Sequence, residues 1–402
     1  MRVFVGTYNA AASPPPEASA AVWRDWLRLD QAPDTVDHSN PYAAPRLQPG
    51  AADVYCLGLQ EIVHLNAVNI LTSDARTDAR VEEWEARVGA VLGEGFVCAA
   101  ALSVVGTALV LFVRELYAAE VEESLISSKF HLFQAAGVSL GNKAVIGVHL
   151  RLNSYTLCFM SCHLPAHRNK CEDRQLAVDD AWAEMSFLGS PSDVLNCDVP
   201  LVGSKGDTCD LKIDSVDCDF VFWFGDMNSR MRADVRTADV WPLVDTIRVG
   251  DKGEKTQEQV QEAWRSLRAM DQMNTPSHRA LGDDQEKGTT PPGYMIEGEP
   301  AGFQLPNAFE EAGELTFLPT YKYEVAEDGA GGAGEVARRG DDGKEDVAAA
   351  GEEGEAGEKG AAVGGGLKPS EYVRLETNAD KYDNWCPAWC DRIFWKVRWK
   401  GI

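Results

Sequence analysis

The stretch FWFGDMNSR, Phe222–Arg230, combines residue types that could do chemistry at a regular spacing. The apolar run FVFWF stops at Gly225, and Asp226, Asn228 and Arg230 then follow at alternate positions. In an extended chain, residues two apart point to the same side, so we expect these three side chains to face one crevice beyond a strand end. An aspartate there can deprotonate water, an asparagine can hydrogen-bond a phosphoryl oxygen, and an arginine can bind phosphate through two parallel hydrogen bonds. The alternative interpretation is a polar turn after a strand.

Polar side chains also follow other predicted strands. Asn9 ends the first strand, Gln60 and Glu61 end the second, and SCHLPAH places His163 and His167 after another apolar run. Two later motifs, PTYK and WCDR, add Tyr321, Lys322, Asp391 and Arg392. Together these residues supply what metal-assisted phosphoester hydrolysis needs: a carboxylate for a hard metal ion, a group that activates water, an acid, and cations that hold phosphate.

Each residue also has a structural interpretation. Glu61 could cap a helix, and His163 could be a core histidine with satisfied hydrogen bonds. Tyr321 and Lys322 could form an amphipathic pair at a sheet edge, and Arg392 could pair with the aspartate before it. The joint occurrence of these residues favours the functional interpretation.

Strand and helix patterns alternate along the chain. RVFVGTYN, DVYCLGLQE, KAVIGVHLRL and TLCFMSCHL predict strands, and AVWRDWLRL and VEEWEARVGAVLG have the spacing of amphipathic helices. In the second helix, Val81, Trp84, Val88 and Val91 share one face. The mixture predicts an α/β or α+β fold.

The segment Phe96–Val113 has no charged residue, and its length is near the lower limit for a membrane span. It is rich in Ala, Ser, Gly and Thr, and VVGTA offers a turn at Gly106. We therefore expect two buried strands joined by that turn, with a membrane span as the alternative.

Length and charge limit the function classes. The 402 residues suit one large domain or two smaller ones, and the net charge of -25 argues against nucleic acid as a partner. A phosphate site in so acidic a protein must be locally basic or contain a metal cation. The N-terminus has no signal-peptide pattern, and the ten cysteines are expected to be free thiols in a reducing compartment, which predicts a cytoplasmic location.

Residues 326–366 differ in composition from the rest of the chain. They are mostly Gly, Ala, Glu and Asp, and 11 acidic and four basic residues lie between Glu327 and Lys359. Such a composition buries too little apolar surface to offset its chain entropy, so we predict a disordered acidic insertion.

Seven motifs carry a family resemblance: TYN, GLQE, GNKAV, SCHLPAH, FWFGDMNSR, FLPTYKY and PAWCDRIFW. They occur in the order seen in inositol polyphosphate 5-phosphatases, and the sequence resembles this family within the DNase I-like endonuclease/exonuclease/phosphatase superfamily. The resemblance runs from Arg2 to about Lys400. It implies a single catalytic domain over residues 1–402 with four layers, in which two packed mixed β-sheets are flanked by helices.

The resemblance also implies residue roles. Glu61 is the expected Mg²⁺ ligand, with Asn9 beside the metal; Asp226 activates the attacking water, and Asn228 and His163 lie at the scissile phosphate. The remaining pocket residues implied are Asn142 and Lys143 near the 1-phosphate, Tyr321, Lys322 and Arg392 at the 4-phosphate, and His167 and Arg230 along the wall.

Three positions depart from the family pattern. Ala144 stands where the family has a glycine after Asn-Lys, and Ser229 stands where it has a tyrosine. The sequence ends at WKVRWKGI, where family members continue into another strand and a Ser-Asp-His motif. The resemblance therefore implies a catalytic domain that is incomplete at its C-terminal end.

The activity that the resemblance implies is Mg²⁺-dependent removal of the 5-phosphate from phosphoinositide lipids or soluble inositol polyphosphates, with peripheral membrane contact. A non-catalytic phosphoinositide-binding homologue is the first alternative, because it would keep the phosphate clamps without turnover. A DNase I-like nuclease is the second: it shares the Glu, Asp-x-Asn and His set, but PTYK and PAWCDR are not expected in it. No protein partner can be predicted from the sequence.

Overall fold

The structure is a computed structural model. It describes residues 1–29, 52–64, 75–104, 106–123, 127–135, 138–188, 212–214, 217–250, 253, 255–274, 302–305, 309–311, 319, 324–325, 372–373 and 388–397. Within these ranges only the backbone is described for residues 75, 122–123, 127–135, 138–142, 212–214, 324–325 and 372–373. The predicted acidic insertion at residues 326–366 lies outside the described residues.

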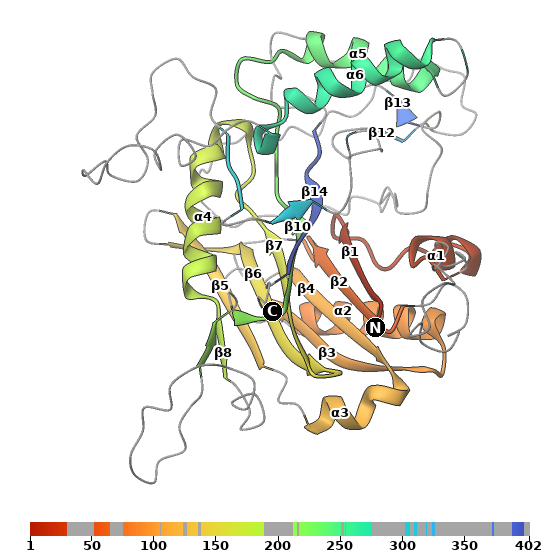
Figure 1. The fold of residues 1–402 in the computed structure, drawn as a ribbon, viewed down its shortest axis with the longest axis vertical. Helices are drawn as coiled ribbons and strands as arrows, with labels where there is room; N and C mark the ends of the chain where they lie inside the picture. The colour runs from red at the N-terminus through yellow and green to blue at the C-terminus, as the bar shows by residue number, and fades with distance from the viewer. Residues whose placement is uncertain are drawn as a thin grey trace, which may run out of the picture.

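Two mixed sheets form the centre of the fold (Figure 1). The first has the order β1-β2-β4-β3. Its strands are β1 (Val3–Asn9), β2 (Val54–Gln60), β3 (Phe96–Val104) and β4 (Thr107–Arg114). Strands β1 and β2 are parallel, and the other pairs are antiparallel.

The second sheet has the order β11-β14-β10-β7-β6-β5. Its strands are β5 (Ser127–Ala135), β6 (Val138–Leu152), β7 (Tyr155–His163), β10 (Phe220–Asp226), β11 (Glu310–Glu311) and β14 (Asp391–Val397). Strands β7 and β10 are parallel, whereas β14 is antiparallel to β10. Two short antiparallel two-stranded sheets, β8 (Ser186–Leu188) with β9 (Lys212–Asp214) and β12 (Glu324–Val325) with β13 (Tyr372–Val373), complete the described strands.

The two sheets pack face to face around a core of aliphatic and aromatic side chains. Val54, Leu109 and Leu111 of the first sheet meet Ile146 and Phe159 of the second in one buried cluster. Gly58 allows the close approach of the sheets, because a Cβ at this position would lie 2.2 Å from Ser161 Oγ and 2.8 Å from a ring carbon of Phe224. A larger residue would therefore push the two sheets apart.

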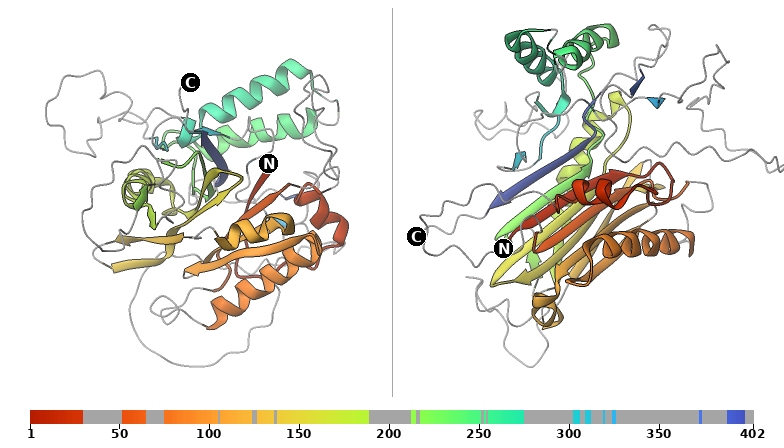
Figure 2. Two further views of the ribbon diagram at one scale, coloured as in Figure 1. Left: turned by 60° about the horizontal axis from the view of Figure 1, so that its bottom comes forward. Right: turned by 90° about the vertical axis from the view of Figure 1, so that its right-hand side faces the viewer.

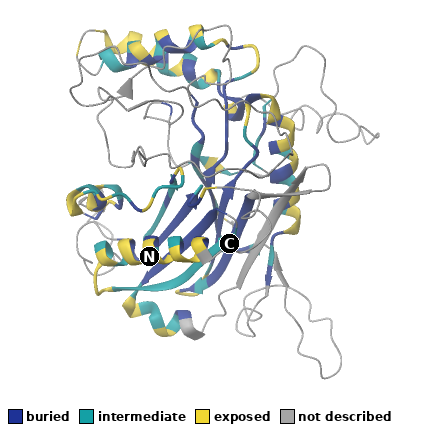
Figure 3. Ribbon diagram, turned by 180° about the vertical axis from the view of Figure 1, so that it is seen from behind, coloured by how far each residue is buried: buried dark blue, intermediate teal, exposed yellow. Residues whose placement is uncertain are grey.

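Helices cover the outer face of each sheet (Figures 1 and 2). Helix α2 (Ala75–Leu92) packs Trp84 and Val88 against the first sheet, together with α1 (Ala20–Trp26). Figure 3 shows the exposed residues of α2 on its outer side and the buried strands beneath it. Helix α4 (Cys171–Glu184) packs against the second sheet. The four-layer α+β architecture predicted from the sequence is confirmed.

Six other helical segments among the described residues connect or extend these layers. They are η1 (Glu115–Tyr117), α3 (Ala118–Glu123), η2 (Arg168–Lys170), the hairpin of α5 (Thr237–Gly250) and α6 (Gln257–Ala269), and η5 (Gln272–Asn274). Helix α6 begins with a capping box. The Thr256 hydroxyl accepts from the Gln259 backbone N–H, and the Gln259 side-chain oxygen accepts from the Thr256 backbone N–H. The α5–α6 hairpin packs on Trp389, which immediately precedes Cys390 and β14.

The uncharged segment Phe96–Val113 forms β3 and most of β4, which pair as an antiparallel hairpin around Gly106. Gly106 has a φ of 76°, a left-handed conformation that suits glycine. The prediction of two strands joined by a turn is confirmed. Among the described residues, no helix combines the length and hydropathy needed to cross a membrane.

Candidate active site

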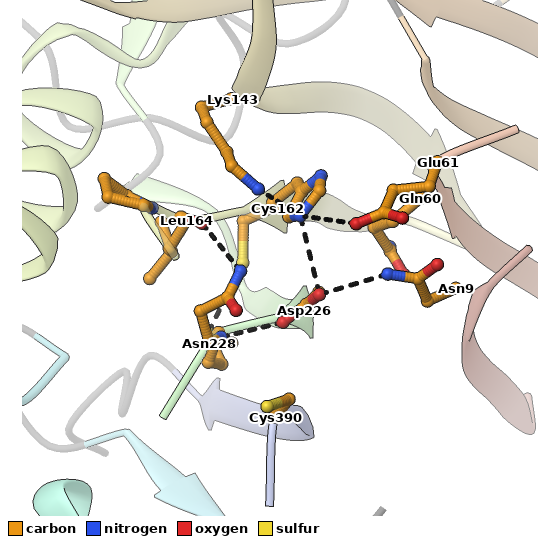
Figure 4. A network of polar contacts seen from close by, with 12 residues as sticks. Asn9, Gln60, Glu61, Lys143, Cys162, Leu164, Asp226, Asn228 and Cys390 are labelled. Carbon is orange, nitrogen blue, oxygen red and sulfur yellow. Dashed lines mark hydrogen bonds and ion pairs between the residues drawn. The ribbon is translucent and has the colours of Figure 1, made fainter. Parts of the chain in front are cut away.

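The polar strand ends meet because both pairs of parallel strands finish at the same edge of the two-sheet core. In the first sheet Asn9 is aligned with Gln60, and in the second His163 is aligned with Asp226. The sheets lie against each other at β1 and β10, so residues from four strands and the turns after them converge on one region (Figure 4). The parallel register explains why polar residues distant in sequence become neighbours.

Glu61, His163 and Asp226 form the centre of this region. Their potential ligand atoms all lie within 4.8 Å of one another. His163 Nε2 lies 3.7 Å from Glu61 Oε1 and 3.5 Å from Asp226 Oδ2. Asn9 Nδ2 donates to Asp226 Oδ2 at 3.3 Å and links the first sheet to the second. The structure thus brings together four residues that the sequence predicted to share a site.

The chemistry of this donor set fits a hard divalent cation. Mg²⁺ usually takes one or two protein carboxylates and keeps several waters. Glu61 and Asp226 supply carboxylate oxygens, and the Glu61 side chain is 42% exposed, which leaves room for water. Glu61 has a φ of 49°, so its side chain reaches the cluster from a left-handed turn directly after β2.

Asp226 is a buried carboxylate in a positively charged setting. Burial alone would raise its pKa, but the opposing charges of His163, Lys143 and Arg230 dominate, and the pKa of Asp226 lies below its usual range. The backbone N–H of Asn228 also donates to Asp226 Oδ1 at 2.8 Å. Asp226 is therefore held as an ionised acceptor at neutral pH.

Lys143 is buried beside His163. Its Nζ lies 2.5 Å from His163 Nε2, and the tautomer of His163 decides which of the two nitrogens donates in this contact. Burial lowers the pKa of Lys143, while the carboxylates of Asp226 and Glu61 act in the opposite direction. The structure therefore places Lys143 against the central cluster.

Gly225, which ends the apolar run of β10, is required by the close approach of this strand to β7. Its φ is 131°, and a Cβ there would lie 2.1 Å from the carbonyl oxygen of Cys162. No other residue type fits so close to β7 in this conformation. Glycine thus allows β10 to lie close to β7 and to place its last residue, Asp226, level with His163.

The path of the chain after Asp226 differs from the sequence prediction. The expectation of an extended chain with Asp226, Asn228 and Arg230 on one side is wrong in its geometry, because the strand ends at Asp226 and Asn228 adopts a φ of 47°. The three residues remain together through a turn: Asn228 donates its backbone N–H to Asp226, and Arg230 Nη2 donates to Asn228 Oδ1 at 2.5 Å. Hydrogen bonds between side chains and the backbone stabilise this turn and compete with continuation of the strand.

Asn228 is fixed by neighbours on both sides of its amide. Its Nδ2 donates to the carbonyl of Leu164 at 2.8 Å, while its Oδ1 accepts from Arg230. The amide therefore joins the segment after β7 to the segment after β10.

Arg392 lies on β14, and its guanidinium is bound to two protein carboxylates. Nη1 donates to Asp271 Oδ1 at 3.2 Å, Nη2 donates to Glu311 Oε2 at 2.8 Å, and Nε bonds the other oxygen of Glu311. The residue is only 2% exposed. It pairs with carboxylates distant in sequence, whereas the structural alternative from the sequence was a pair with the neighbouring Asp391.

The remaining predicted pocket residues differ in how much of each the structure describes. His167 is exposed and has a φ of 75° at the start of η2. Asn142 lies on β6, where only the backbone is described. Tyr321 and Lys322 lie outside the described residues, so their roles stay predictions.

Sequence reasoning missed a buried polar layer behind the site. Asp271 is fully buried and accepts from Ser229 Oγ, at 3.2 and 3.1 Å to its two oxygens, as well as from Arg392. Gln272 and Arg174 are also buried, and burial lowers the pKa of Arg174 to about 10. The sequence feature that could have indicated this layer is the Asp-Gln pair between apolar residues in AMDQM, at the end of α6. The residues that bond to this pair are distant in sequence and are determined by tertiary structure.

The two-sheet fold and the acidic–histidine cluster at its strand ends define a DNase I-like architecture. The model of the endonuclease/exonuclease/phosphatase family 2 matches residues 6–303, and the chain belongs to this family. Sequence relatives agree with the resemblance to inositol polyphosphate 5-phosphatases. Type I inositol polyphosphate 5-phosphatase 8 of Arabidopsis thaliana is 23% identical over 98% of this chain and 65% of its own length.

Two further relatives have names from the same group. Synaptojanin-1 of Homo sapiens is 25% identical over 82% of this chain and 16% of its own length. Type II inositol 1,4,5-trisphosphate 5-phosphatase of Mus musculus is 26% identical over 81% of this chain and 25% of its own length. The chain thus spans less than two thirds of the length of each of these three relatives.

A solved structure shares the fold. The inositol polyphosphate 5-phosphatase domain of a synaptojanin, in complex with inositol (1,4)-bisphosphate and a calcium ion, superposes with a TM-score of 0.55 at 19% identity. The match covers 99% of this chain and 76% of that chain.

Proposed function

We propose that this chain hydrolyses the 5-phosphate of phosphoinositide lipids or soluble inositol polyphosphates in a Mg²⁺-dependent reaction. The observation that carries the proposal is the convergence of Glu61, His163 and Asp226, with ligand atoms within 4.8 Å of one another at the joint strand ends. Family membership supports a phosphoesterase reaction, and the relatives' names suggest the substrate class.

The residues of the site suit this reaction. Asp226, held ionised, would accept the proton of the attacking water, and Asn9 would fix the orientation of its carboxylate. His163 and Lys143 would lie at the transferred phosphoryl group, where positive charge is most useful. Glu61 would hold Mg²⁺ beside Asp226 and would supply, when the ion is bound, a site that neutralises phosphoryl charge.

Local charge supports an anionic substrate despite the acidic chain. Lys143 and Arg230 lie next to the central cluster, and Arg168 and Arg174 lie in the protein directly beneath the turns that follow β7 and β10. The net charge of -25 over the whole chain opposes a nucleic-acid substrate, as the sequence predicted. We extend the proposal to action in the cytoplasm, with peripheral contact when the substrate is a lipid.

The metal requirement is tested with Glu61→Gln, which removes one anionic ligand and keeps the side-chain shape. Phosphate release from inositol 1,4,5-trisphosphate is measured against Mg²⁺ concentration, with an EDTA-treated sample as reference. We expect release to stop with EDTA and the Mg²⁺ concentration for half-maximal rate to rise by more than about 10-fold in Glu61→Gln, since even outer-shell groups have effects of this size. Glu83→Gln, in an exposed ion pair on α2, is the matched control. Metal-independent release would contradict the proposal, and binding of inositol phosphate without turnover would favour the non-catalytic alternative.

A further inference from the structure

Gln272, in η5, lies beneath the two segments that carry the phosphate-facing residues. Its backbone N–H donates to the carbonyl of Arg230 at 2.9 Å, and its Oε1 accepts from the Arg230 backbone N–H at 3.2 Å. On the opposite side, its Nε2 donates to the carbonyl of Arg168 at 3.0 Å. One buried amide therefore bonds the segment after β10 and the segment after β7 at the same time.

Arg174, from α4, completes this connection. Its Nη2 donates to Gln272 Oε1 at 2.5 Å, and its Nη1 donates to the carbonyls of Pro165 and His167 at 2.9 and 2.8 Å. These three acceptors are two backbone carbonyl oxygens and one side-chain amide oxygen, and none is a carboxylate. The guanidinium therefore binds neutral groups through these hydrogen bonds. The side chain is fully buried and lies over the ring of Phe303.

The two bonded segments bear residues of the candidate site. The segment after β7 follows His163 directly and includes His167, and the segment after β10 includes Asn228 and Arg230. Positive φ values at His167 and Asn228 show that neither turn follows from regular strand geometry. Such conformations persist only where surrounding contacts determine them.

We propose that Arg174 and Gln272 act together as positioning residues for phosphate recognition, by fixing the turn that bears His167 against the turn that bears Asn228 and Arg230. The inference rests on the proposed function of the same site. The hydrogen bonds of Arg174 and Gln272 lead to the two turns and to each other, so their effect reaches the substrate through the turns. A displacement of about 1 Å in such a frame can lower the rate by about 100-fold.

The test compares Gln272→Met and Arg174→Met with Thr156→Val. Thr156 makes a partly buried bridge at the opposite ends of the same strands: its Oγ1 donates to Asp219 Oδ2 at 3.0 Å and accepts from the Asp219 backbone N–H at 2.8 Å. All three variants remove side-chain hydrogen bonds that join the β7 and β10 segments, but only the first two act at the candidate site. For each variant, kcat/KM for phosphate release is measured well below the melting temperature. The folded fraction of the same sample is determined by circular dichroism.

We expect Gln272→Met and Arg174→Met to lower kcat/KM for phosphate release by about tenfold or more and to weaken inositol 1,4-bisphosphate binding by a similar factor. Thr156→Val should leave both quantities within about twofold while lowering the melting temperature. Because the two residues bond to each other and hold the same pair of turns, the double variant should lose no more than the more impaired single variant. Losses that multiply in the double variant would overturn the joint role.

The two readouts separate this inference from the proposed function. Absence of phosphate release by the unaltered chain would refute the proposed function, and bisphosphate binding would still test the positioning role. Gln272→Met protein that folds and keeps unaltered binding and turnover would overturn the inference. If Arg174→Met does not fold, Gln272→Met alone gives this result.

Discussion

Asn9 and Asp226 are 217 residues apart in sequence, yet Asn9 Nδ2 donates to Asp226 Oδ2 at 3.3 Å across the two sheets. Asn9 is the last residue of β1, and Asp226 is the last residue of β10. The Asn9 side chain is fixed in turn, because its Oδ1 accepts from the backbone N–H of Ala11 at 3.0 Å. The orientation of the Asp226 carboxylate therefore depends on both sheets.

Asn9→Ala should impair turnover more than folding. The substitution removes the donor that orients Asp226, and loss of such an outer contact typically lowers activity by about 10- to 100-fold. The measurement is kcat/KM for phosphate release, together with the melting temperature. Asn274→Ala is the matched control, because its amide bonds the exposed end of α6. Equal kcat/KM in the two variants would show that Asn9 does not orient Asp226.

Gly225→Ala should destabilise the whole domain. The left-handed φ alone costs about 1–3 kcal/mol for a residue with a side chain, and the new Cβ would also collide with the Cys162 backbone. The free energy of unfolding in urea measures this effect. Gly95→Ala serves as control, since its Cβ would meet nothing within 4 Å. A Gly225→Ala protein as stable as the control would mean that β10 does not approach β7 in this way.

Arg392→Met separates a structural role from a substrate role. Because the guanidinium is buried between Asp271 and Glu311, its loss should cost about 3–5 kcal/mol of stability. The same contacts predict equal loss of turnover on substrates with and without a 4-phosphate. Arg265→Met, in an exposed pair with Glu262, is the control for stability. A selective loss on 4-phosphorylated substrates would instead support the role that the family resemblance implies.

The architecture and the central cluster were predictable because they depend on local patterns. Alternating apolar runs predicted the strands, and Trp84 and Val88 predicted the buried face of α2, since periodicity reports burial directly. Glu61, His163 and Asp226 each lie at the end of an apolar run, and parallel pairing makes such ends converge. The cluster could therefore be predicted from the polar residues at the ends of the predicted strands.

The polar layer behind the site was not predictable in the same way. Arg174 and Gln272 are nearly a hundred residues apart, and each lies in a helical segment where a polar residue usually faces solvent. Their burial depends on how α4 and η5 pack against the turns after β7 and β10, which no local pattern reports. The turn at Asn228 was missed for a related reason, because the competing hydrogen bonds to Asp226 and Leu164 form only in the folded protein.

The most direct test of the central claim is phosphate release from inositol 1,4,5-trisphosphate by the unaltered chain and by Asp226→Asn, with the bisphosphate product identified by ³¹P NMR. Asp226→Asn keeps the side-chain shape but cannot accept a proton from water, and we expect turnover to fall by about 100- to 10,000-fold while inositol 1,4-bisphosphate still binds. Asp245→Asn, on the exposed side of α5, should behave as the unaltered chain. The account predicts inositol 1,4-bisphosphate as the product of the unaltered chain, and loss of that product in Asp226→Asn. Release of a different phosphate, or undiminished turnover in Asp226→Asn, would contradict it.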